Sequence, residues 1–162
     1  MAGKDTGKVA FLADAIAQER IRELCTLLPD AQSWTDEAAL ALAANRPILT
    51  SQGYGTALHL HVKRDFDLRK ATQPAAYAGV FAEYSIDASG GDVSYGTTGS
   101  TRLDLVQLIP ALKPKIVCIY EIKSGAATVQ KSQRDLQMLR MWAAYPEAEI
   151  LMMQVKPSVH AF

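Results

Sequence analysis

Two carboxylates and a lysine lie within stretches that otherwise have the composition of buried β-strands. Asp104 interrupts the apolar residues of TRLDLVQLI, and Glu121 and Lys123 close the run KIVCIYEIK. Charged side chains are rarely buried unless they are paired or bind a ligand. These three residues are therefore the first candidates for chemistry in the chain.

Side-chain alternation along the strands relates the three charges to one another. In the first stretch Leu103 and Leu105 share one face and Asp104 lies on the other, and in the second stretch Glu121 and Lys123 share a face. The short connection PALKP between the stretches predicts a hairpin in which Asp104 faces Glu121. Only one register does this, because a slip of one residue would turn one of the carboxylates away.

Two neighbouring carboxylates in a half-buried place repel each other and lose hydration, which is costly unless a cation lies between them. Mg²⁺ is commonly held by one or two carboxylates together with water and phosphate oxygens. A lysine beside such an ion can orient or activate a water, or stabilise charge on the reacting phosphate. The pattern thus predicts Mg²⁺ or Mn²⁺ and phosphate chemistry. The structural alternative is a pair of edge-strand acids, one of which forms a salt bridge with Lys123.

The elements around the hairpin follow from hydrophobic periodicity and turn signals. Helices are predicted over residues 8–28, 35–45, 56–70 and 129–145, and strands over 80–87, 101–109, 115–123 and 148–157. Thr35 is predicted to cap the second helix, and the last helix is predicted to turn Val129, Leu136, Leu139 and Trp142 inward. This order predicts a mixed α/β (α+β) fold.

The placement of Asp104 in one strand and Glu121-Ile122-Lys123 at the end of the next, followed by a helix, resembles the PD-(D/E)XK nuclease superfamily. Its restriction-endonuclease-like core is a helix, a three-strand meander, a helix and a further strand, an order matched by residues 54 to about 157. The resemblance divides the chain into an N-terminal helical extension, residues 1–50, and a nuclease-like core, residues 51–162. Leu103 stands where the motif name has proline.

The resemblance also implies roles for the motif residues. Asp104 corresponds to the metal-binding aspartate, Glu121 to the second acidic ligand and Lys123 to the catalytic lysine. The backbone carbonyl of Ile122 would complete the metal shell. All four assignments depend on the predicted hairpin register.

Two further residues occupy positions that families of this fold often use. His59 stands where the first helix often carries a glutamate, and Gln133 is the glutamine that follows the lysine by ten residues. The resemblance implies that both belong to the catalytic site and orient substrate or water. Both have plain alternatives, a packed or solvated histidine and a surface glutamine. His61 lies about 200° further around the helix than His59, so the two histidines cannot reach one site.

The function implied by the resemblance is that of a Mg²⁺-dependent endonuclease that hydrolyses phosphodiester bonds of DNA or tRNA. The phrases GSTRLDLV, YEIKSG and GTALHLHV further resemble the C-terminal nuclease domains of contact-dependent or secreted bacterial toxins. Such domains act in the cytoplasm of a target cell and are neutralised by an immunity protein. The alternatives are a non-catalytic nucleic-acid- or protein-binding module on the same fold, and a transcription or repair factor that binds without cutting.

The charge balance of the chain favours the binding-module alternative slightly. Lysine and arginine together number 17, equal to aspartate and glutamate, whereas nucleic-acid binders usually carry a basic excess. A local cluster would offset this balance, and one face of the predicted helix 56–70 carries Lys63, Arg64, Arg69 and Lys70.

The remaining composition predicts a globular protein without a membrane partner. No apolar run approaches the roughly 18 to 20 residues that span a bilayer. The two cysteines, Cys25 and Cys118, lie in unrelated apolar stretches and are predicted to be buried thiols.

Overall fold

A mixed β-sheet organises the part of the chain that the structure describes. In this computed structural model those residues are 9–11, 15–87, 90–91, 93, 99–124 and 128–158. The helices are α1 (Ala15–Leu24), α2 (Leu28–Leu42), the 3₁₀-helix η1 (Ala43–Ile48), α3 (Ser51–Thr72) and α4 (Lys131–Ala144). The strands are β1 (Val9–Phe11), β2 (Val80–Ile86), β3 (Thr101–Ile109), β4 (Ile116–Ile122) and β5 (Glu149–Val155). The predicted mixed α/β arrangement is confirmed.

The sheet has the strand order β1-β5-β4-β3-β2. Strands β2, β3 and β4 form an antiparallel meander, which confirms the predicted hairpin between β3 and β4. After the crossover helix α4, β5 pairs parallel to β4, as expected for a connection of that length. The end of β4 therefore lies at the same edge of the sheet as the beginning of β3, and this edge carries the charged residues.

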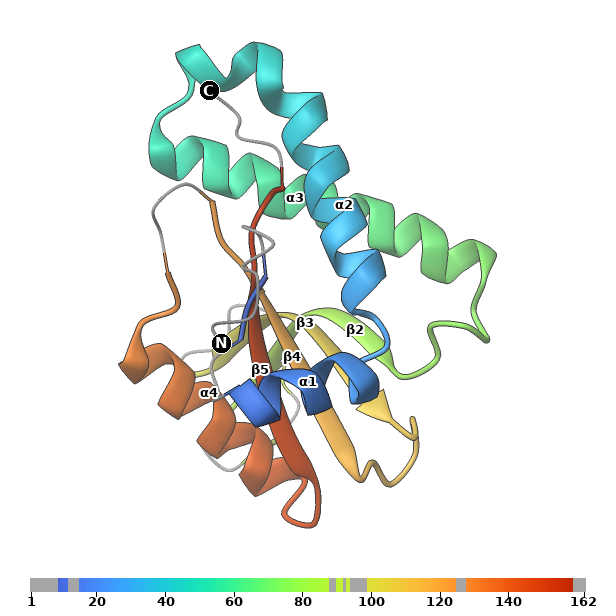
Figure 1. The fold of residues 1–162 in the computed structure, drawn as a ribbon. Coiled ribbons are helices and arrows are strands. Elements are labelled where there is room, and N and C mark those ends of the chain that lie inside the picture. The colour runs from blue at the N-terminus through green and yellow to red at the C-terminus, as the bar shows by residue number, and fades with distance from the viewer. Residues whose placement is uncertain are drawn as a thin grey trace.

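Helices cover both faces of the sheet (Figure 1). One face packs against α1, α2 and α3, and α3 contributes the stripe Leu58, Val62 and Phe66, as its spacing predicts. The other face packs against α4 through Met141. Each such side chain contributes about 1.5–3 kcal/mol when fully buried, so α3 and α4 are firmly fixed on opposite sides of the charged edge.

Helix α3 begins earlier than its periodicity predicts. The Thr50 hydroxyl accepts a hydrogen bond from the Gly53 N–H at 2.9 Å and caps the helix. Residues 51–55, which precede the predicted start at residue 56, therefore form the first turns of a 22-residue helix. This extension brings additional residues of α3 up to the charged edge.

Two predictions for the N-terminal region are wrong. Val9–Phe11 forms a short strand on β5, in place of the predicted start of a helix. Thr35 does not cap a helix, since it is buried within α2 and its hydroxyl donates to the Ala31 carbonyl at 2.7 Å. Helix α2 instead begins at Leu28 with Pro29 in its first turn. Backbone N–H groups in the first turn have no hydrogen-bond acceptor within the helix, so the N–H that proline lacks is not needed there.

The N-terminal region is joined to the sheet by a covalent bond as well as by packing. Cys25 and Cys118 form a disulfide between the α1–α2 junction and β4, so the prediction of two thiols is wrong. Beside it, the Gln107 side-chain oxygen accepts from the Leu27 N–H at 3.1 Å and from the Tyr120 hydroxyl at 2.8 Å. Residues on either side of the predicted 50/51 boundary thus share one core.

Helix α4 turns a different face to the sheet from the one predicted. Val129 is buried as expected, but Leu136, Leu139 and Trp142 are exposed. The buried residues are Gln137 and Met141, which continue a stripe that begins with Gln133 at a spacing of four residues. The inward face of α4 is therefore partly polar, and its polar end lies at the charged edge of the sheet.

The lysines of α3 do not form an open basic surface. Lys63 Nζ lies 2.6 Å from the Asp67 carboxylate. Lys70 turns inward, donates to the Val80 carbonyl at 2.6 Å and lies over the Phe81 ring, and burial lowers its pKa. Of the four basic residues on this helix, Lys63 and Lys70 are thus engaged within the fold, and Arg64 and Arg69 are exposed.

Candidate active site

The register of the hairpin brings the two carboxylates together. Pairs between β3 and β4 run from Ile109–Ile116 to Leu105–Tyr120, and one further step in the same register sets Asp104 opposite Glu121. The Asp104 N–H donates to Glu121 Oε1 at 3.3 Å, and the Ile122 N–H donates to Asp104 Oδ2 at 2.8 Å. Each carboxylate therefore accepts a backbone hydrogen bond from the opposite strand.

The alternation of side chains between the two faces of the sheet is broken at Asp104, and this break changes the direction of its side chain. Leu103 packs in the cluster on the α4 face, whereas Leu105 packs on the α3 face, although alternation predicts one face for both. Across the sheet, β2 contains Glu83 with a positive φ of 50°, and the expected Glu83–Asp104 pair is missing from an otherwise continuous register. At this kink Asp104 turns toward His59 of α3, while Glu121 faces Gln133 of α4.

Glu121 is almost completely buried, with 2% of its surface exposed. Burial raises the pKa of Glu121 well above its ordinary value of 4.5, and the neighbouring Asp104 carboxylate raises it further. The charge of Lys123 acts in the opposite direction. The pair thus favours either a proton on Glu121 or a cation close to it.

Gln133 links Glu121 to Lys123. Its Nε2 donates to Glu121 Oε2 at 3.3 Å, and its Oε1 accepts from Lys123 Nζ at 3.5 Å. Lys123 follows the end of β4, and its backbone N–H donates to the Val155 carbonyl of β5 at 3.0 Å. The amide of Gln133 therefore sets the positions of both charged groups from α4.

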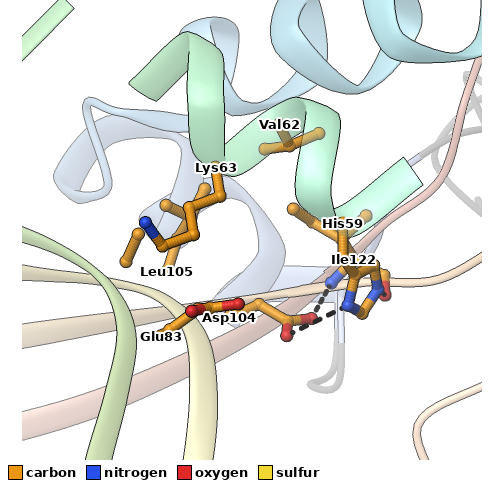
Figure 2. A pocket seen from close by; sticks show the side chains of 8 residues that line it. His59, Val62, Lys63, Glu83, Asp104, Leu105 and Ile122 are labelled. Carbon is orange, nitrogen blue, oxygen red and sulfur yellow. Dashed lines mark hydrogen bonds and ion pairs between the residues drawn. The ribbon is translucent and has the colours of Figure 1, made fainter. Parts of the chain in front are cut away.

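His59 approaches the pair from α3, on the other side of the hairpin. Its Nε2 lies 2.6 Å from the Ile122 carbonyl oxygen and its Nδ1 lies 3.5 Å from Asp104 Oδ1 (Figure 2). Because the carbonyl can only accept, Nε2 carries a proton in this arrangement. His61 lies away from the site, with its Nδ1 3.5 Å from the Asp65 carboxylate.

Sequence reasoning overlooked two residues at the site, Glu83 and Gln137. Glu83 and Lys63 line a small cavity of about 10 Å³ next to Asp104 (Figure 2). Gln137 is buried one turn after Gln133 and donates to the Arg102 carbonyl at 3.4 Å. The spacing of the glutamines on α4 was the available signal for Gln137. No local signal marks Glu83, since positive φ is uncommon for glutamate.

The residues present suit a hard cation. Asp104, Glu121 and the Ile122 carbonyl offer oxygen ligands, which Mg²⁺ and Mn²⁺ prefer. A cation would also compensate the buried pair, whose proximity raises the pKa of Glu121. Within the described residues no group of three histidine, cysteine, aspartate or glutamate side chains is arranged to hold a metal. A metal here would therefore depend on two carboxylates, a carbonyl and water.

The raised pKa of Glu121 predicts an unusual dependence of stability on pH in the absence of metal. The folded state holds the Glu121 proton more tightly than the unfolded state, so the free energy of unfolding should fall as pH rises above 4.5 toward the raised pKa. Glu121→Gln keeps the shape without the charge. We expect it to match wild type near pH 4.5 and to be more stable by about 1–3 kcal/mol at pH 8.

Urea unfolding in EDTA across this pH range measures the effect. The exposed Glu147, near the opposite end of the sheet, provides the matched control Glu147→Gln. A difference between Glu121→Gln and wild type that stays constant with pH would contradict the assignment of a buried, protonated Glu121.

Comparisons with known proteins do not assign the chain to a family. No known protein family, curated protein or solved structure matches the chain significantly. Among the described residues, no helix has both the length and the apolar character needed to cross a membrane.

Proposed function

We propose that the chain is a metal-dependent endonuclease of the restriction-endonuclease-like fold, which hydrolyses phosphodiester bonds of DNA or tRNA. The observation that carries this proposal is the interlocked pair Asp104 and Glu121, with Gln133 joining Glu121 to Lys123. Two carboxylates held together in a nearly buried place repel each other and lose hydration, and a bound cation would compensate this cost.

The arrangement of elements supports the proposal. Helix α3, the meander β2–β4, helix α4 and the parallel strand β5 follow one another as the resemblance implies. The candidate residues come from four of these elements and converge at one edge of the sheet. Such convergence on rigid strands and helices is a common way to hold catalytic groups in place.

Asp104, Glu121 and the Ile122 carbonyl would hold Mg²⁺ or Mn²⁺. When bound, such an ion lowers the pKa of a coordinated water and neutralises charge on the phosphate. The protein contributes the placement of the ligands. The Ile122 N–H fixes the Asp104 carboxylate, and the Asp104 N–H fixes that of Glu121.

Lys123 would act on the phosphate and the attacking water, and Gln133 would hold Lys123 in place. The Lys123 ammonium offsets the negative charge that accumulates on the phosphate oxygens during attack. Gln133 holds this ammonium and Glu121 at once, so it serves as a positioning residue. A water oriented in line with the leaving oxygen would yield a 5′ phosphate and a 3′ hydroxyl.

His59 would position the site and would not act as its base. Its Nε2 proton is held by the Ile122 carbonyl and its Nδ1 faces Asp104, so both ring nitrogens are already engaged within the protein. The imidazole links α3 to both the carbonyl and the aspartate. His59 therefore sets the separation between α3 and the end of β4.

Incubation of the purified protein with plasmid DNA and with tRNA tests the proposal. Cleavage is expected with Mg²⁺ or Mn²⁺ and is expected to stop in EDTA. Intact DNA and tRNA in the presence of either metal would overturn the enzyme proposal and favour the non-catalytic binding module. Equal cleavage in EDTA would overturn the role of the metal.

The same proposal extends to a setting in bacterial competition, with delivery into a target cell and an immunity protein as partner. The Cys25–Cys118 disulfide supports it, because such bonds form in oxidising compartments and are rare in proteins that stay in the cytosol. A toxin domain would cross an oxidising compartment before it reached its substrate in the cytoplasm.

A further inference from the structure

A groove of about 450 Å³ opens beside the candidate site. Lys123, Ile122 and His59 belong both to the site and to the lining of this groove. The groove continues from there along the first turns of α3, and it shares Glu83, His59 and Ile122 with the small cavity that Asp104 lines.

One wall of the groove is a single face of α3. Its residues are spaced by three or four positions, the spacing that brings side chains together on one side of a helix: Gln52, Gly55, Thr56, His59 and Leu60. This face carries no acidic side chain. The early start of α3 at Ser51 is what creates it.

The opposite wall comes from the strand ends. Arg102 is exposed at the beginning of β3, and Lys123 and Ser124 follow β4. The two cations and the neighbouring hydroxyl groups suit a phosphodiester backbone, which is bound by arginine, lysine, serine and threonine side chains in most complexes. Glu83 is the acid on this wall and lies where the groove meets Asp104.

The two walls come together at Gly55. A Cβ atom built there would lie 3.4 Å from Ser124 Oγ, an ordinary van der Waals contact. A methyl group therefore fits, but a larger side chain at this position must extend into the groove. The width of the groove thus depends on glycine at residue 55.

We propose that this groove binds an unpaired nucleic-acid strand next to the bond that is cut, so that the substrate is single-stranded or looped nucleic acid and intact duplex is a poor substrate. The inference rests on the proposed nuclease function.

Access to the carboxylates is the first reason. Glu121 is 2% exposed and the Asp104 side chain 10%, whereas the groove leads to His59 and Ile122, which both contact Asp104, so a strand in the groove lies beside the pair.

The size of the groove is the second reason. Its volume falls within the range of roughly 300–1,000 Å³ that is typical of sites for one small ligand, which corresponds to a nucleotide or two. A double helix, whose major groove alone is about 12 Å wide, does not enter such a space without unpairing.

The charge distribution is the third reason. The chain has no net charge, and Lys63 and Lys70 of α3 are engaged by Asp67 and by the Val80 carbonyl. Duplex binding without unpairing usually requires a row of cations that follows both phosphate backbones. The groove instead presents its cations, Arg102 and Lys123, close to the reacting centre.

Cleavage of matched substrates tests this inference directly. One sequence is presented as a single strand, as a perfect duplex and as a duplex with a central unpaired loop, each as DNA and as RNA, with Mg²⁺. We expect kcat/KM to be at least tenfold higher for the single strand and for the loop than for the duplex. Equal or faster cleavage of the perfect duplex would overturn the inference and leave the nuclease proposal standing.

Variants of Gly55 test the groove itself. Gly55→Leu should weaken binding of the single strand at least tenfold, whereas Gly55→Ala, whose methyl group fits against Ser124 Oγ, should weaken it less than threefold. Fluorescence anisotropy with a labelled oligonucleotide measures binding, in an Asp104→Asn background in which cleavage is expected to be slow. Thr56→Trp fills the groove from an exposed position and replaces Gly55→Leu if that variant does not fold.

The two assays separate the inference from the function on which it rests. If wild type cuts none of the substrates, the nuclease proposal fails, and the anisotropy results alone decide the inference. Single-strand binding that Gly55→Leu weakens at least tenfold and Gly55→Ala weakens less than threefold would support it. Absence of binding, or equal binding by both variants, would overturn it.

Discussion

Asp104→Asn and Glu121→Gln are each expected to reduce kcat for phosphodiester cleavage by about 10³-fold, equal to about 4 kcal/mol of transition-state stabilisation. Both replacements keep the shape of the side chain and an oxygen that can accept the backbone hydrogen bond from the opposite strand. They remove the negative charge that would hold the metal. Cleavage of a labelled oligonucleotide under single-turnover conditions with saturating Mg²⁺ measures the loss.

Glu147→Gln again serves as the control, because this exposed acid lies near the end of the sheet away from the hairpin edge. Thermal unfolding establishes that each variant is folded, and titration with Mn²⁺ establishes whether the loss of rate accompanies a loss of metal affinity. A folded Asp104→Asn or Glu121→Gln protein that retains activity within threefold of wild type would show that these carboxylates are not the metal ligands.

The central strands and the hairpin could be predicted from sequence because their signals are local. Strict alternation in TRLDLVQLI and the continuous apolar run KIVCIYEIK fixed the bounds of β3 and β4 to within a residue. The short connection implied the antiparallel pairing. The register was predicted from the expectation that Asp104 and Glu121 share one cation and so lie opposite each other. The structure has that register. The catalytic roles of these residues stay a prediction.

Features that depend on distant parts of the chain could not be predicted. β1 is three residues long and exists through its pairing with β5, so a helical pattern of apolar residues concealed it. The disulfide joins residues 93 positions apart, and neither cysteine has a neighbouring signal. The reversal of faces between Leu103 and Leu105 accompanies a positive φ at Glu83, which lies on another strand.

The face of α4 that packs on the sheet is set by polar contacts and not by the apolar stripe of its sequence. Leu136, Leu139 and Trp142 form the apolar stripe of the sequence, but the helix faces the sheet with Gln133, Gln137 and Met141. The glutamines bond to Glu121 and to the Arg102 carbonyl. A local departure from the expected burial pattern at this point is itself typical of a functional site.

Removal of the disulfide is expected to cause the largest change in stability. Cys25→Ala combined with Cys118→Ala should lower the free energy of unfolding by about 2–4 kcal/mol, because the bond closes a long loop in the unfolded chain. Both residues are fully buried, so the loss of the sulfur atoms contributes in the same direction. For a chain of this size the midpoint of thermal unfolding should fall by roughly 5–15 °C.

Reduction of the wild-type protein gives an independent measure of the same bond. Wild type unfolded and refolded with a reductant should lose most of the stability that the double variant loses, while the double variant should not respond to the reductant at all. Thiol titration in denaturant should find no free thiol before reduction. Two free thiols in the untreated protein, or an unchanged unfolding midpoint after complete reduction, would contradict a stabilising link between the α1–α2 junction and β4.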